Sequence, residues 1–190
     1  DLYMIMGDIL NKKGLEDESF AAYDSCFQWK DDNVAALNNY AYYISLKGKE
    51  LHKAEQMSFK TIKAEPKNGT YLDTYAWILF MEERYHEAKI YIDQAIANLD
   101  STQNNNTVIE HAGDIYAMNG LTEEALKFWK QSYDAGNKSE GIMTKIKNKR
   151  YITEEEIKRM TGGSAVTPDR KSQSRSGAKK NNKLRNGKKK

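Results

Sequence analysis

The sequence of 190 residues is poor in residues that break helices or cross-link a chain, with 2 prolines, 12 glycines and 1 cysteine. So few prolines and glycines are compatible with long helices, because both residues weaken helix interiors. No segment alternates apolar and polar residues over the length of a strand, so we predict no sheet. The single cysteine, Cys26, cannot form a disulfide within the chain, which leaves the redox compartment open.

Long apolar segments are missing as well. No run of about 18 apolar residues is present, so the sequence predicts no membrane-spanning helix. No secretory signal peptide is visible. The sequence begins at Asp1, inside a segment with the pattern of a helix, and we therefore expect a fragment or a processed chain. This expectation leaves open whether a signal sequence, a lipid anchor or further repeats precede it.

The patterns of common catalytic and cofactor sites are also missing. His52, His86 and His111 have no metal-ligand spacing, and Ile90 stands where a zinc-binding His-Glu-x-x-His helix needs its second histidine. There is no glycine-rich phosphate loop and no Gly-x-Ser-x-Gly turn. We interpret Cys26 as a small packed side chain, since no basic partner is placed near it. The sequence predicts no catalytic residue, metal ion, cofactor or small-molecule substrate.

A helix hairpin, in contrast, recurs along the chain. In residues 71–96, large apolar side chains follow helical spacing on both sides of a tight turn near Glu83 and Arg84. A hairpin this short cannot bury its own apolar face and needs copies on either side. Small residues at intervals of 34 to 37 positions reveal four copies. In the first helix they are Gly7, Ala41, Ala76 and Gly113; in the second helix they are Ser19, Ala54, Ala88 and Ala125, then Cys26, Thr61, Ala95 and Ser132.

Helix pairs with a period of roughly 34 residues are typical of tetratricopeptide repeats, or TPRs. The sequence resembles that family, of the bacterial type, at Gly7, Pro66, Tyr116, Gly120 and Ala125. The resemblance implies an all-α fold: a right-handed α-solenoid of four TPR helix pairs at residues 1–33, 34–68, 69–102 and 106–139. The repeat is a scaffold with many unrelated uses, so it says less about function than about fold.

Residues 140–160 are predicted to form capping helices. Ile142, Met143 and Ile146 make an apolar stripe on a helix over residues 140–149, which would cover the open end of the solenoid. Thr153 and Glu156 have the spacing of a capping box, which predicts a short helix from this point to residue 160. Residues 161–190 hold almost no apolar side chain and are predicted to be a disordered basic tail.

Charge divides the chain in two. Residues 161–190 contain 10 Lys or Arg and 1 Asp, whereas residues 1–160 contain 20 Lys or Arg and 26 Asp or Glu. The tail is either a solubilising segment that can fold back on the acidic body, or a contact for nucleic acid phosphates or an anionic membrane. No aromatic residue lies in it, so such binding would be blind to base sequence. The contact residues predicted are Arg170, Lys171, Arg175, Lys179, Lys180, Lys183, Arg185, Lys188, Lys189 and Lys190.

The resemblance further implies a concave groove lined by the first helix of each pair, where TPR ligands lie as extended peptides or helices. We predict that one flank of these helices is exposed there, opposite the packing stripe. Amides can hold a peptide backbone and aromatic residues can anchor it, with Tyr42 and Trp77 as the anchors. The alternative is that these are ordinary solvated residues, with the two rings partly packed. The groove residues are Met4, Asp8, Asn38, Asn39, Tyr42, Asp73, Thr74, Trp77, Glu110, His111 and Asp114.

The charges of this flank indicate the kind of partner. TPR domains that clamp the acidic tails of heat-shock chaperones use Lys, Arg and Asn along the groove. This sequence has Asn39 at one such position but Met4, Asp8, Thr70 and Thr74 at others. Four carboxylates in the groove would also repel an acidic tail. We therefore expect the partner to be another protein, bound through a peptide or helix that is basic or rich in amides.

Together these observations predict a non-catalytic scaffold or adaptor that binds a partner protein in the concave groove. The alternative is a polyanion-binding protein in which the solenoid only presents the basic tail. The amino-acid sequence of residues 37–42 and 71–77 resembles that of bacterial TPR proteins, many of which are envelope-associated adaptors. That resemblance favours the periplasmic side of a bacterial envelope, with the cytoplasm as the alternative.

Overall fold

The structure, a computed structural model, describes residues 2–162. The predicted polyanion contacts all lie at residue 170 or beyond and are outside the described residues. Within them the chain forms ten α-helices and no strand. Their bounds are α1 Leu2–Lys12, α2 Glu16–Trp29, α3 Val34–Leu46, α4 Leu51–Ala64, α5 Gly69–Met81, α6 Tyr85–Ala97, α7 Asn106–Met118, α8 Thr122–Asp134, α9 Glu140–Asn148 and α10 Glu154–Met160.

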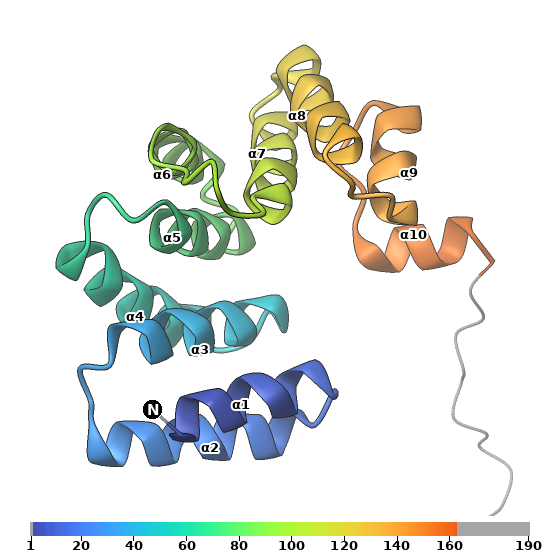
Figure 1. The fold of residues 1–190 in the computed structure, drawn as a ribbon. Helices are drawn as coiled ribbons and strands as arrows, with labels where there is room; N and C mark the ends of the chain where they lie inside the picture. The colour runs from blue at the N-terminus through green and yellow to red at the C-terminus, as the bar shows by residue number, and fades with distance from the viewer. Residues whose placement is uncertain (1, 163–190) are drawn as a thin grey trace, which may run out of the picture.

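The first eight helices form four antiparallel pairs that stack into a curved α-solenoid, as predicted (Figure 1). Short turns join the helices of each pair. Glu83 adopts a left-handed conformation with φ 61° between α5 and α6, at the turn expected from sequence. Asn33 and Asn68 begin α3 and α5, since each side chain accepts a hydrogen bond from a backbone N–H in the first turn.

Small residues sit where the two helices of a pair come close, which confirms the predicted positions. All of those in the second helices are fully buried. At Gly7 an added Cβ would lie 2.7 Å from the ring of Tyr23, and at Gly113 it would lie 2.4 Å from the ring of Trp129. Glycine at these two positions therefore lets an aromatic ring of the second helix lie against the backbone of the first.

The carboxy-terminal end is covered by α9, which packs against α8. Ile142 is fully buried in a cluster with Ala125, Leu126 and Trp129. Met143 is 44% exposed and lies outside this buried cluster, at the surface beside Lys130 and Tyr133 of α8. The capping box of Thr153 and Glu156 is present at the start of α10, which confirms that prediction.

Candidate functional site

The inner side of the solenoid is formed by α3, α5 and α7, and it is more closed than the sequence indicated. The expectation that its flank is exposed is wrong for six residues: Asn38, Asp73, Thr74, Trp77, His111 and Asp114 are all buried. Asp8, Asn39, Tyr42 and Glu110 are partly exposed. Two contacts explain this closure. The curvature brings Tyr42 of α3 to His111 of α7, and the chain's own segment from α9 to α10 lies over α5 and α7.

A buried ion cluster attaches α9 to α7. The Nζ of Lys145 lies 2.8 Å from a carboxylate oxygen of Glu110 and 2.7 Å from one of Asp114. The second oxygens are also occupied: Trp129 Nε1 donates to Asp114 at 2.9 Å, and Asn137 Nδ2 donates to Glu110 at 2.6 Å. Every carboxylate oxygen in the cluster therefore has a hydrogen-bond donor, while the single lysine balances one of the two negative charges.

The pKa values of Lys145 and Glu110 reflect the pairing, whereas burial outweighs it at Asp114 and raises the pKa of that carboxyl group. Burial opposes the charge on Lys145, but the carboxylates of Asp114 and Glu110 outweigh it and raise the pKa of Lys145 above its ordinary value. Burial likewise opposes the charge on Glu110, but the ammonium group of Lys145 outweighs it and lowers the pKa of Glu110. Both groups therefore carry their charges at neutral pH.

An aromatic stack lies beside the ion cluster. The ring of Trp77 is stacked on His111, with centroids 4.0 Å apart, and on Phe80 at 4.8 Å. His111 Nδ1 lies 2.9 Å from Asp73 Oδ1, and Tyr151 meets Phe80 edge-on at 5.2 Å. Trp77 is only 8% exposed, so the prediction of a freely accessible anchor is wrong: this ring belongs to the packed core.

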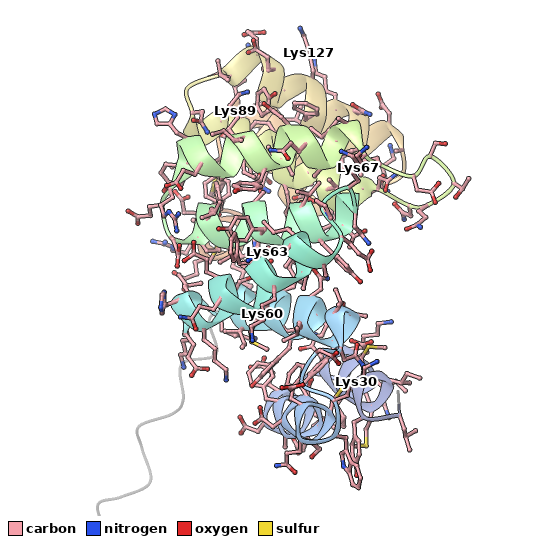
Figure 2. All side chains as sticks on the ribbon, turned by 90° about the vertical axis from the view of Figure 1, so that its left-hand side faces the viewer. Lys30, Lys60, Lys63, Lys67, Lys89 and Lys127 are labelled. Atoms are coloured by element: carbon pink, nitrogen blue, oxygen red, sulfur yellow. The ribbon has the colours of Figure 1, made fainter. Side chains whose placement is uncertain are left out.

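Between the inner side and the segment from α9 to α10 lies a cavity of about 430 Å³. It combines aromatic rings with carboxylates and two lysines. On the opposite, outer side of the solenoid, lysines such as Lys60, Lys63 and Lys89 project from the second helices (Figure 2). The cavity is lined by Tyr42, Leu46, Trp77, Thr107, Glu110, His111, Asp114, Ser139, Gly141, Lys145, Tyr151, Ile152, Glu154, Ile157 and Lys158.

The pKa of the Tyr42 hydroxyl depends on the electrostatics of this cavity. Its burial raises the pKa of its hydroxyl well above the ordinary value, and the nearby carboxylates of Asp73, Glu110 and Glu154 raise it further. The contribution of these carboxylates, as distinct from that of burial, indicates a negative potential at the hydroxyl. The cavity is therefore suited to a group that donates hydrogen bonds or carries positive charge.

Ten of the fifteen residues that line the cavity are ones that the sequence did not indicate. Lys145, Tyr151, Ile152, Glu154 and Lys158 belong to α9, α10 or the turn between them. The one feature of the sequence that could have indicated this segment is the apolar pair Tyr151 and Ile152 between two predicted helices. Ile152 is 1% exposed, so this pair ties the turn to the inner side.

Asp8 and Asn39 lie apart from the cavity, in a cluster that joins α1, α2 and α3. Asp8 accepts hydrogen bonds from Tyr23, from Tyr43 at 3.1 Å and from Asn39 Nδ2 at 3.2 Å. The side-chain Nδ2 of Asn38 donates a hydrogen bond to Asn39 Oδ1 at 3.3 Å. The side-chain oxygen of Asn38, Oδ1, is buried without a donor among the described residues. This cluster fixes the first pair against the second.

Other chemistry finds little support in the part of the chain that the structure describes. No group of three His, Cys, Asp or Glu side chains there is arranged to hold a metal ion. Burial raises the pKa of the fully buried Cys26, which disfavours the reactive thiolate. Of the ten described helices, none is both long and apolar enough to cross a membrane.

Solved structures with the same arrangement of helices identify the fold. The type IV pilus biogenesis factor PilW superposes with a TM-score of 0.68 at 16% identity, over 85% of this chain and 69% of its own. Pseudomonas aeruginosa PilF gives a TM-score of 0.67 at 16% identity, over 78% of this chain and 66% of its own. YrrB, described as a TPR protein with an unusual peptide-binding site, gives 0.55 at 17% identity, over 77% of this chain and 74% of its own.

The chain has the TPR fold. Sequence comparison with protein-family models and with curated proteins finds no match. This chain spans just under two thirds of the length of PilF.

Proposed function

We propose that this TPR solenoid captures a basic segment of a partner protein in the cavity between its inner side and the segment from α9 to α10. The observation that carries the proposal is the cavity itself, about 430 Å³ in volume, with rings and carboxylates in one wall. Cavities of this size are typical of sites that enclose one or two side chains of a ligand.

The lining favours a lysine or arginine side chain. Glu110, Asp114 and Glu154 contribute three carboxylates, while Lys145 and Lys158 contribute two ammonium groups, and Lys145 is already held between Glu110 and Asp114. A positive charge is attracted by this excess and by the faces of nearby aromatic rings such as Tyr42. An amide-rich segment would meet the same carboxylates with its N–H donors.

The structural neighbours support a role of this kind in the bacterial envelope. PilW is described as a type IV pilus biogenesis factor. YrrB is described as having a peptide-binding site. We propose by analogy that the present chain acts as an adaptor on the periplasmic side of the envelope.

Selection from a phage-displayed library of random peptides tests whether the cavity binds a basic segment. We expect Lys and Arg to be enriched in the peptides that the wild-type protein retains. The double variant Tyr42→Ser and Glu154→Lys alters two lining residues that are not fully buried, and it should lose these peptides while keeping its helical circular dichroism. Glu124→Lys, an equal charge change on the exposed surface of α8, is the matched control and should retain them. Equal retention by all three proteins would show that the cavity is not the binding site.

A further inference from the structure

The outer side of α4 carries a compact group of lysines. Lys60 and Lys63 lie on the exposed face of this helix, and Lys67 follows in the turn after it, at intervals of three and four residues. Residues with this spacing on a helix share one face. Figure 2 shows the three lysines on the same outer side of the solenoid. We call them the α4 lysine group.

The group has no full counter-charge within the part of the chain that the structure describes. No ion pair there joins any of the three lysines to a carboxylate. The nearest carboxylates along the chain belong to Glu55 and Glu65. Glu55 is paired with Arg84 at 2.7 Å, and Glu65 accepts a hydrogen bond from Asn68 Nδ2 at 2.8 Å. Three ammonium groups against the one remaining carboxylate, that of Glu65, leave a positive excess, which attracts an anionic partner.

Large apolar side chains are exposed next to these lysines. Phe59 is 44% exposed, and the centroid of its ring lies 5.5 Å from the Nζ of Lys63. On α6, the second helix of the following pair, Ile90 is 58% exposed beside Lys89. Lysine stems lie along apolar surface while their ammonium groups reach polar groups. Exposed apolar side chains together with lysines are typical of surfaces that rest on the headgroups of a membrane.

The position of α4 in the solenoid limits what can cover this surface. The helix belongs to the second of four pairs, and α3 and α5 pack against it, so its outer side is not an end at which a further repeat would stack. Residues 161–190 carry 10 Lys or Arg against 1 Asp, and like charge opposes their contact with the lysines. A nucleic acid or an acidic peptide would pair with the lysines but offers no apolar layer for Ile90. A membrane surface supplies both phosphates and an apolar layer.

We propose that the outer side of α4 binds the surface of a membrane that contains anionic phospholipids. The ammonium groups of the α4 lysine group contact the lipid headgroups, while Phe59 and Ile90 enter the boundary between the headgroups and the acyl chains. The cavity lies on the inner side of the solenoid, so lipid binding would leave it free for a partner. This inference does not depend on the proposed function of the cavity.

A fluorophore whose emission depends on its environment, NBD, tests this contact in the full chain. The label is attached at Ala64→Cys, an exposed position between Lys60 and Lys67, because the native Cys26 is fully buried. Vesicles of phosphatidylcholine with phosphatidylglycerol should shift the emission to the blue, since the label leaves water, and vesicles of phosphatidylcholine alone should not. The same label at Ala135→Cys, exposed at the end of α8, is the matched control and should not respond.

Charge reversal separates the α4 surface from the basic residues near the carboxy terminus. The triple variant Lys60→Glu, Lys63→Glu and Lys67→Glu should abolish the blue shift at position 64, even where flotation shows that the protein is still on the vesicles. The loss of three lysines near an anionic surface should weaken the contact by roughly a hundredfold. A control triple variant makes the same change in net charge at exposed positions elsewhere and should keep the shift: Lys12→Glu, Lys13→Glu and Lys147→Glu.

Four results would overturn the proposal. They are a lack of response at position 64 to anionic vesicles, an equal response at position 135, a shift that survives reversal of the α4 lysine group, and a larger shift with duplex DNA or polyglutamate than with vesicles. The last would identify a nucleic acid or an acidic protein as the partner. A shift that requires both anionic lipid and the α4 lysine group supports the proposal.

Discussion

Among the described residues, the first helix α1 exposes Leu2, Ile5, Met6 and Ile9, while at the other end the last pair is covered by α9. Both end pairs have the same internal design, with a glycine of the first helix under a ring of the second. Exposure at each end is therefore decided by what packs outside the pair, and not by the sequence of the pair itself. The difference teaches that the internal packing of a repeat does not depend on whether its outer face is covered within the described residues.

The largest expected effect on stability comes from a substitution in the ion cluster at the covered end. Lys145→Ala leaves Glu110 and Asp114 buried without a cation, which should lower the free energy of unfolding by about 3–5 kcal/mol. Urea denaturation measures the change. Lys147→Ala removes an exposed lysine from the same helix and should have almost no effect. A small loss at Lys145 would mean that α9 is not attached through this cluster.

Apolar truncation sharpens the comparison of the ends. Ile142→Ala removes a fully buried side chain from the interface of α9 and α8 and should cost about 2–5 kcal/mol. Ile5→Ala, at the exposed end, should change stability by less than about 0.5 kcal/mol. Thermal unfolding of both variants, followed by circular dichroism, compares them. Equal losses would contradict the difference in burial.

The two glycines give a smaller contrast. Gly113→Ala places a methyl group 2.4 Å from the ring of Trp129, which Asp114 holds by a hydrogen bond, and should cost about 2–3 kcal/mol. Gly7→Ala meets the ring of Tyr23 at 2.7 Å, near the uncovered end, and should cost about 1 kcal/mol. Chemical denaturation ranks the two. The reverse order would show that the first pair is the more tightly packed.

The smallest expected effect is the contribution of Glu110, at the covered end, to the pH dependence of stability. The pKa of Glu110 is lower in the folded protein than its ordinary value of 4.5, so its contribution to stability is present above that pH and is lost as pH falls through the folded pKa. Glu110→Gln should flatten the fall in stability below about pH 4.5. Ile5→Ala should retain the wild-type slope. An unchanged slope in Glu110→Gln would exclude Glu110 as its source.

The sequence predicted the repeat well because the information is local. Small residues such as Ala41, Ala76 and Ala88 recur at the period of the fold, and each marks a contact with the nearest helix. The turn at Glu83 and the capping box at Thr153 are likewise decided by residues a few positions apart. Such features depend on neighbours in the chain, which a sequence shows directly.

The site was harder to predict because its form depends on distant segments. The burial of Trp77 follows from its stacking on His111 of the next first helix, and the burial of Asp114 follows from Lys145 of α9. The lysine lay in a segment interpreted only as a cap, so nothing in its own surroundings indicated that it would enter the groove. The negative charge of that flank was visible in the sequence; the internal cation that pairs with part of it was not.

The position of Lys145 in the chain has a consequence for synthesis. Asp114 stands 31 residues before the lysine that neutralises it, and Glu110 stands 35 residues before. As the chain emerges from the ribosome amino end first, the four helix pairs can stack one on another while these two carboxylates still face water. The inner side is then open and at its most acidic, and it closes only when α9 arrives.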